Sequence, residues 1–246
     1  ARERASFSFH RKECPMTKML RVGCALRARG KRLLMQTHFG AGICYGKFIT
    51  SKEKRSKAMR ITLKDGSVKE YAQPMSVLDV AKDLSEGLAR VACAGEVDGE
   101  AVDLRTVLEE DCSLNILTAK DEKGLAALRH SASHVMAQAI KRLYPSAKLA
   151  IGPSIADGFY YDMDFENPIT AEDLEKIEAE MKKIVKEALP IERFTLPREE
   201  AIAFMKEKEE PYKVELIEDL PEGEEISFYK QGEFTDLCAG PHLMSN

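Results

Sequence analysis

Two short pairs of side chains, far apart in the sequence, constrain the fold of this chain more than any other feature. His130 and His134 form one pair, and Cys238 and His242 form the other. Positions i and i+4 share one face of a helix, so the two histidines can converge, whereas the second pair lies in a Gly-Pro loop. One thiolate and three imidazoles would suit tetrahedral zinc, and without a metal they could position a water for ester hydrolysis. We expect a fold that brings both pairs into one cleft; the spacing leaves both chemistries open.

The charge of the chain changes sign near residue 58. Residues 1–58 contain 15 of the 37 basic residues and 3 of the 41 acidic ones, a net charge of +12, which leaves residues 59–246 at −16. This leader lacks sustained periodicity, and we interpret it as disordered or not native. A transit peptide, a nucleic-acid-binding arm and non-coding sequence read through in frame all fit; Met59 opens the patterned part, which favours read-through. The acidic remainder cannot bind RNA through bulk charge and would need a local basic patch or further domains.

The cysteines and the apolar segments indicate the compartment. The chain has six cysteines, no Cys-x-x-Cys pair and no spacing typical of a secreted disulfide framework, which fits a reducing, cytoplasmic environment. It also lacks an uninterrupted run of about 18 apolar residues and a compact secretory signal. We therefore expect neither a membrane span nor export.

Residues 59–120 are predicted to form a small α+β domain. Alternating apolar residues enter and leave an Asp65-Gly66 hairpin turn, Ser76 can cap a helix, and 91–97 and 113–117 are typical of strands. This order of elements resembles the TGS domain, which has a ubiquitin-like β-grasp fold.

Residues 121–246 are predicted to form a larger α+β domain. The patterns predict a short linker at 121–124, helices at 125–143, 171–188 and 199–209, a strand at 159–165, and extended segments at 212–217 and 226–229. A capping box at Thr170 opens the second helix. On the first helix, His130 and His134 lie opposite the apolar stripe, so they should face solvent, a cleft or a second layer.

Two common motifs are missing. The first histidine pair is not His-Glu-x-x-His, so the catalytic glutamate of a zinc peptidase is absent. Neither a P-loop nor a Gly-x-Gly-x-x-Gly sequence occurs, so an ATP-using step would have to lie elsewhere.

Several ordered motifs together resemble bacterial threonyl-tRNA synthetases. They are Arg129–His134, Ala150–Pro153, Gly158–Asp162, Tyr212–Val214 and Asp236–His242. The resemblance covers Met59 to Asn246, with the TGS-like segment first and the editing domain (the second additional domain) next, and no part of the leader. It implies a chain truncated before the aminoacylation domain.

The resemblance implies a hydrolase that removes serine wrongly attached to threonine tRNA. A synthetic site that admits threonine cannot fully exclude the smaller serine, so editing supplies the missing discrimination. By resemblance, His130 and His134 would position the terminal adenosine or water, and Lys213 would provide positive charge or orient the water. Asp236 would hold the amino group of the substrate. Without the resemblance, Lys213 would be interpreted as surface charge and Asp236 as a turn former.

The remaining site residues raise the question of a metal. By resemblance, Cys238 and His242 would complete the pocket wall, and Tyr161, otherwise a core aromatic, would narrow it. Alanyl-specific editing relatives use a similar set to bind zinc, whereas the threonyl type works without it. We expect no metal to be required; the ligands of a bound zinc would be His130, His134, Cys238 and His242.

The resemblance also sets the expected partners. It implies threonine tRNA mischarged with serine as the partner, with ATP, zinc and a homodimer interface belonging to absent domains of the parent threonine–tRNA ligase. Two other functions remain open: a metal-dependent hydrolase of another substrate, and a non-enzymatic TGS-type module that binds RNA or regulates.

Overall fold

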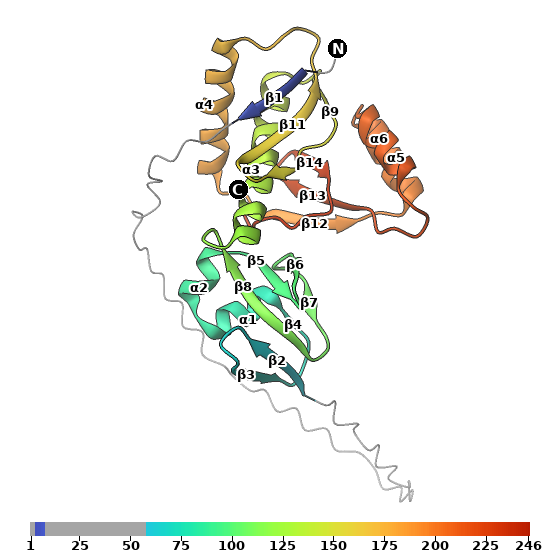
Figure 1. The fold of residues 1–246 in the computed structure, drawn as a ribbon. Helices are drawn as coiled ribbons and strands as arrows, with labels where there is room; N and C mark the ends of the chain where they lie inside the picture. Colours follow the sequence, from blue (N-terminus) through green and yellow to red (C-terminus); the bar gives the residue numbers. More distant parts are fainter. Residues whose placement is uncertain (1–2, 8–57) are drawn as a thin grey trace, which may run out of the picture. The chain divides into compact units, whose positions relative to one another are not determined.

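The computed structural model describes residues 3–7 and 58–246 (Figure 1). The described chain mixes helices and strands, which confirms the predicted α+β class. Apart from residues 3–7 and 58, the leader to which the sequence assigned disorder or a non-native origin lies outside the described residues.

The first part of the patterned chain builds a mixed sheet with the strand order β3-β2-β8-β5-β6. The hairpin β2–β3 and the pair β5–β8 are antiparallel, whereas β2 and β8 are parallel. The bounds are β2 Met59–Leu63, β3 Val68–Tyr71, β4 Met75–Ser76, α1 Val77–Leu84, α2 Glu86–Val91, β5 Ala92–Val97, β6 Glu100–Val102, β7 Val107–Leu108 and β8 Cys112–Thr118.

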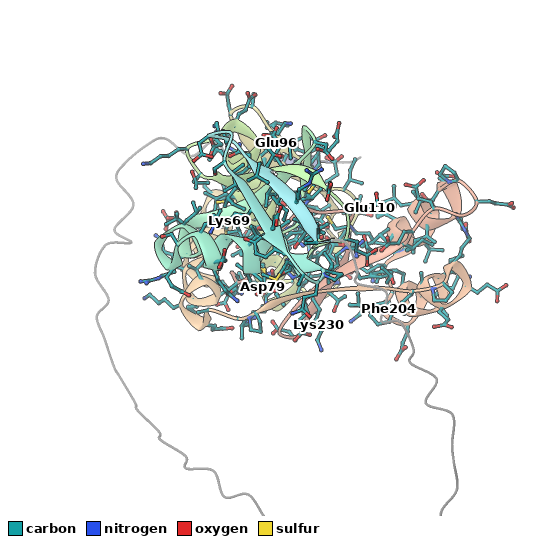
Figure 2. All side chains as sticks on the ribbon, turned by 90° about the horizontal axis from the view of Figure 1, so that it is seen from below. Lys69, Asp79, Glu96, Glu110, Phe204 and Lys230 are labelled. Atoms are coloured by element: carbon teal, nitrogen blue, oxygen red, sulfur yellow. The ribbon has the colours of Figure 1, made fainter. Side chains whose placement is uncertain are left out.

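Helix α1 covers this sheet and completes its core. Ser76 caps the helix as predicted, since its hydroxyl accepts a hydrogen bond from the Asp79 amide at 3.1 Å. Val77 and Val80 are fully buried together with Ile61 and Leu104. Charged side chains such as Lys69 and Asp79 are exposed on the surface of this part (Figure 2).

Helix α3 (Glu122–Leu143) follows β8 without the predicted linker. Asp121 is the N-cap residue, and its carboxylate accepts hydrogen bonds from the amide of Thr118 at 2.8 Å and from its hydroxyl at 3.0 Å. Gly124 lies so close to this strand end that a Cβ would stand 2.1 Å from the Thr118 carbonyl oxygen. The predicted linker 121–124 was wrong, because its polar residues cap and open the helix.

A second sheet and helix α4 cover one side of α3. The bounds are β1 Glu3–Phe7, β9 Lys148–Leu149, β10 Ser154–Ile155, β11 Gly158–Asp164 and α4 Ala171–Glu187. Both β10 and β9 pair with β11, and Phe159, Met163 and the apolar face of α4 share a core with α3. The predicted capping box is present: Thr170 accepts from the Asp173 amide, and the Asp173 carboxylate accepts from the Thr170 amide.

Strand β1 was not anticipated from the sequence. It pairs antiparallel with β11, so that the backbone of Ala5 lies opposite that of Tyr161. The short alternation of serine and phenylalanine at residues 6–9 is the only sequence signal for it.

A third sheet covers the histidine side of α3. Its order is β12-β13-β14, and α5 and α6 pack beside it with a separate apolar core (Figure 1). The bounds are β12 Ile191–Thr195, α5 Arg198–Glu207, α6 Pro211–Asp219, β13 Ser227–Gln231 and β14 Phe234–Leu237. Because both sides of α3 are covered, residues 133–140 are all buried, and the predicted apolar stripe is only part of the buried surface. Leu143, the apolar residue at the end of the helix, is exposed.

The predicted extended segment 212–217 was wrong, because these residues belong to helix α6. The alternation of Tyr212, Val214 and Leu216 suggested a strand, but Pro211 occupies the first helical turn, where proline is favoured. The residues that the helix buries are Lys213 and Ile217, which are four positions apart. This helical spacing turns Lys213 inward.

Candidate functional site

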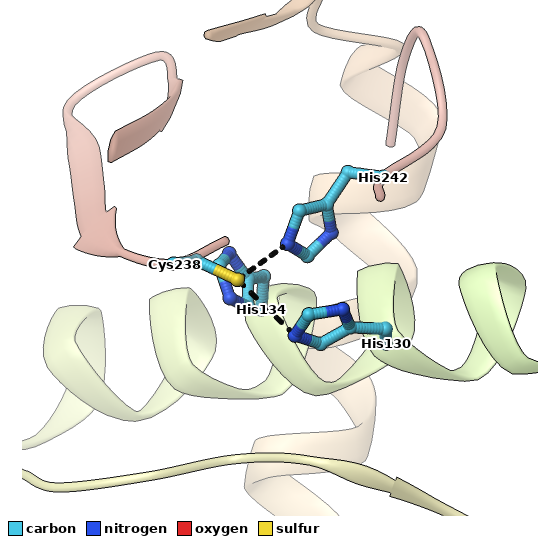
Figure 3. Close-up of side chains that lie close together, drawn as sticks. All are labelled: His130, His134, Cys238 and His242. Atoms are coloured by element: carbon cyan, nitrogen blue, oxygen red, sulfur yellow. Dashed lines mark hydrogen bonds between the residues drawn. The ribbon is translucent and has the colours of Figure 1, made fainter. Parts of the chain in front are cut away.

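The histidine pair and the Cys238/His242 pair converge on one point. His130 and His134 project from α3, while Cys238 and His242 come from the segment after β14 (Figure 3). One ligand atom from each of the four lies within 4.8 Å of those of the others. The His242 ring centroid lies 4.2 Å from that of His130 and 4.1 Å from that of His134. The structure therefore has the predicted convergence of the two pairs.

The thiol of Cys238 is the centre of the cluster. Its Sγ lies 3.2 Å from Nε2 of His130 and 3.2 Å from Nε2 of His242 (Figure 3). The Gly240 amide donates to the sulfur at 3.3 Å. Burial raises the pKa of the Cys238 thiol to about 12, so the sulfur keeps its proton near neutral pH. A protonated thiol can donate to one of the two imidazoles at a time.

The three imidazoles are neutral. Burial is the main cause that lowers the pKa of His130, and it lowers the pKa values of His134 and His242 well below the usual range of histidine. For the last two, the repulsion that would arise if neighbouring histidines were protonated together lowers the pKa further. Near neutral pH the cluster therefore offers basic nitrogens, which can accept a proton from a bound water.

Ser131 fixes the tautomer of His242. The Ser131 hydroxyl has an acceptor in the Ala127 carbonyl oxygen at 3.0 Å, and its oxygen accepts from the Leu243 amide at 2.9 Å; with its hydrogen directed to Ala127, it accepts from Nδ1 of His242 at 3.2 Å. Nδ1 of His242 then carries the hydrogen, and Nε2 presents its lone pair to Cys238. Ser131 was missed from the sequence as a site residue, although it lies within the first histidine pair.

A buried ion pair adjoins the histidines. The Lys213 ammonium lies 2.6 Å from Oδ1 of Asp236 and also donates to the Tyr161 hydroxyl at 2.9 Å. That hydroxyl in turn donates to Oδ2 of Asp236. Nε2 of His134 lies 3.5 Å from the same carboxylate. Lys213 is thus not a surface charge, and Asp236 is not a turn former but a residue of strand β14.

The backbone of Gly152 closes the site over Tyr161. A Cβ at Gly152 would lie 2.2 Å from the Tyr161 ring, and the Gly152 carbonyl accepts from the Ser133 hydroxyl at 2.9 Å. The loop after α3 is therefore fixed against the aromatic ring, and only glycine permits this approach. The motif Ala150–Pro153 is visible in the sequence, but its contact with Tyr161 depends on the position of strand β11.

The four converging side chains could hold a metal ion. One sulfur and three imidazole nitrogens are a donor set that zinc favours, and the imidazoles are already neutral as ligation requires. Ligation would require the ion to displace the proton of the Cys238 thiol, whose pKa is raised to about 12, and that proton would be released to solvent. The arrangement therefore fits either a bound metal or the hydrogen-bond network described above.

None of the described helices, within residues 58–246, is long and apolar enough to cross a membrane.

Comparison with known proteins identifies a TGS domain at residues 59–118. The chain is 67% identical over 187 residues to a threonine–tRNA ligase of Acetivibrio thermocellus and 62% identical over 187 residues to that of Clostridioides difficile. A threonine–tRNA ligase of Caldanaerobacter subterraneus is 60% identical over 189 residues.

These matches cover 76% or 77% of this chain but only 29% of each relative. The chain therefore spans less than a third of the length of the curated relatives that it matches. The matched part is the N-terminal region of those proteins. This chain is thus homologous to the N-terminal region of the threonine–tRNA ligases and carries the TGS domain found there.

Proposed function

We propose that residues 121–246 form an editing hydrolase, which cleaves the ester between serine and the terminal ribose of threonine tRNA. Convergence of the two residue pairs beside the buried Lys213–Asp236 pair carries the proposal. Ester hydrolysis requires an oriented water, a stabilised oxyanion and a proton for the leaving ribose oxygen. The cluster contains groups suited to each of these tasks.

Water activation falls to the imidazoles. His130 is only half-buried, in contrast to His134 and His242, so it is the histidine that a bound ester can reach. Its depressed pKa keeps it neutral and able to accept a proton from water. The protonated imidazole can then return that proton to the ribose oxygen.

Substrate binding falls to the charged side chains. The amino group of an aminoacyl ester is a cation, and the Asp236 carboxylate lies 3.5 Å from the imidazole of His134. Lys213 already neutralises this carboxylate, so the substrate ammonium must share or displace it. A displaced Lys213 ammonium would stabilise the developing oxyanion. Tyr161 and the backbone of Gly152 form a close wall that limits the size of the amino-acid side chain.

The decisive experiment compares two esters of one tRNA. The full chain should hydrolyse seryl-tRNA for threonine faster than threonyl-tRNA, by roughly 10–200-fold, the discrimination that one methyl group supplies in a sieve. Single-turnover assays with excess protein reveal the difference even when tRNA binding is weak. Equal rates on the two esters would reject the assignment.

A metal-dependent hydrolase is the second candidate, since the donor set of the four converging residues favours it. Stoichiometric zinc whose removal abolishes hydrolysis would establish that function. A chain that binds RNA but hydrolyses neither ester would instead be a non-enzymatic TGS-type module.

The same proposal extends to the protein as a whole. Threonine tRNA is the proposed partner, and the compartment is the cytoplasm. Joining of threonine to tRNA with ATP, catalytic zinc and dimerisation are assigned to other domains of a longer protein.

A further inference from the structure

A loop of the TGS domain reaches the backbone that carries His242. The loop, residues 103–105, contributes Leu104 to the TGS core, where its side chain is fully buried. Its backbone is fixed by hydrogen bonds from the Leu78 amide to the Leu104 carbonyl at 2.9 Å and from the Val77 amide to the Thr106 carbonyl at 3.0 Å. Asp103 and Arg105 are therefore presented from a rigid base.

Asp103 contacts the histidine segment directly. Its side chain is 8% exposed, and Oδ2 accepts from the His242 amide at 3.3 Å and from the Tyr229 hydroxyl at 3.0 Å. The Tyr229 ring packs edge-on against the His242 ring, with 4.4 Å between centroids. One carboxylate oxygen thus contacts both the backbone of His242 and the tyrosine whose ring lies beside its imidazole.

Arg105 holds the same segment from its carbonyl side. Its guanidinium pairs with Asp103 at 2.8 Å and donates to the Leu243 carbonyl at 3.0 Å and to the His242 carbonyl at 3.5 Å. It also donates to the Ile191 carbonyl of β12. A planar guanidinium with several fixed donors sets the positions of these acceptors more tightly than an ammonium would.

The residues after His242 are also packed against the TGS domain. Leu243 packs on a cluster formed by Cys93, Ala94 and Leu117 of that domain together with Ala127 of α3. Met244 packs on the TGS core. The TGS domain therefore holds residues 242–244 through polar contacts to their backbone and through apolar contacts to Leu243 and Met244.

We propose that Asp103 and Arg105 are positioning residues for His242, so that the TGS domain helps to assemble the hydrolytic site; the catalytic consequence rests on the proposed function. Neither residue reaches the reacting atoms. They act through the His242 backbone and Tyr229, which set the imidazole against Ser131 and Cys238. A displacement of about 1 Å in a catalytic group can cost about 100-fold in rate.

The test uses the full chain with Arg105→Ala, Arg105→Lys and Asp103→Asn. We expect Arg105→Ala to lower kcat for hydrolysis of the seryl ester by about 10- to 100-fold with little change in KM, because the substrate contacts remain. Arg105→Lys should retain the pair with Asp103 but lose the forked contacts, and should be intermediate. Asp103→Asn should resemble Arg105→Ala.

A second measurement does not depend on activity. Nitrogen NMR of the histidine side chains should show one His242 tautomer, with the hydrogen on Nδ1, in the unaltered chain and a mixture in Arg105→Ala, at a temperature where both are folded. This readout would test the positioning even if the chain hydrolysed neither ester. A defect of stability alone would leave the tautomer unchanged.

Arg60→Ala is the matched control, since Arg60 also pairs with an aspartate of the TGS domain, Asp111, but on the exposed surface. It should change neither kcat nor the His242 signals. If Arg105→Ala fails to fold, Arg105→Lys decides. An unchanged His242 spectrum in folded Arg105 variants would overturn the proposal, as would an Arg60→Ala effect of equal size.

Discussion

The Lys213 ammonium lies 2.6 Å from the Asp236 carboxylate, and the two side chains are only 3% and 2% exposed. Helix α6 and strand β14 supply the two charges, so the pair joins two elements that are separated in the sequence by strand β13. A buried charge without its partner is costly, whereas a buried pair replaced as a whole by apolar groups is often tolerated. The stability of the fold therefore depends on both charges being present together.

Removing one member of this pair should destabilise the fold. Asp236→Ala leaves the Lys213 ammonium buried without its carboxylate and should lower the free energy of unfolding by about 3–5 kcal/mol. Urea denaturation measures the loss. The double variant Lys213→Met/Asp236→Leu should lose less stability than Asp236→Ala alone and still be inactive. A double variant that loses the sum of both single effects would show that the charges do not interact.

Replacement of His130 should separate activity from stability. His130→Ala should reduce hydrolysis of the seryl ester by about 100-fold or more, because it removes the most accessible basic nitrogen. The melting temperature should change little, since His130 is half-buried and outside the apolar core clusters. Lys69→Ala, which alters an exposed ion pair of the TGS domain, is the control and should leave both quantities unchanged. Normal activity of His130→Ala would exclude the histidine as the base.

The buried histidines should make stability depend on pH. His134 and His242 have pKa values well below 6.5 in the folded chain because of burial, while in the unfolded chain they return to the ordinary value near 6.5. Below pH 6.5 the unfolded state binds protons that the folded state does not, so the free energy of unfolding falls as pH falls. Urea titrations between pH 7.5 and 5.5 should show this decrease. His134→Gln should have a smaller slope, and an equal slope would assign the effect to other groups.

Metal analysis should show substoichiometric zinc in the purified chain. The Cys238 thiol, with a pKa of about 12, already has hydrogen-bond partners in two imidazoles and the Gly240 amide, so the cluster is satisfied without an ion. A chelator should therefore alter neither hydrolysis nor melting temperature. Elemental analysis measures the zinc content. Calorimetry and the seryl-tRNA assay, each with and without chelator, measure the melting temperature and the rate of hydrolysis. One zinc per chain, with unfolding on chelation, would reverse this expectation.

Local signals in the sequence determined much of the secondary structure. The hairpin turn at Asp65-Gly66, the Ser76 cap and the capping box of Thr170 involve residues within a few positions of each other, so their physics is contained in short segments. The α+β class and the TGS domain followed from the order of such segments, and both are confirmed. The two residue pairs were also visible, because each is defined by a separation of four positions.

Other features depended on contacts between distant segments. Helix α6 was misread as extended because apolar residues alternate in it, and the competing helical spacing of Lys213 and Ile217 gains its meaning only when the third sheet buries that face. The same third sheet carries Asp236 on β14, and Lys213 becomes a buried charge beside it. Strand β1 needed the exposed edge of β11.

The sequence by itself determined which side chains could form a site and which family pattern they follow. Only the tertiary structure decided the protonation states of these side chains and the contacts that hold them in place. Burial keeps three imidazoles neutral, Ser131 selects the tautomer of His242, and Asp103 with Arg105 holds its backbone from another domain. Burial and hydrogen bonding between distant residues are properties of the packed molecule, so no local pattern encodes them.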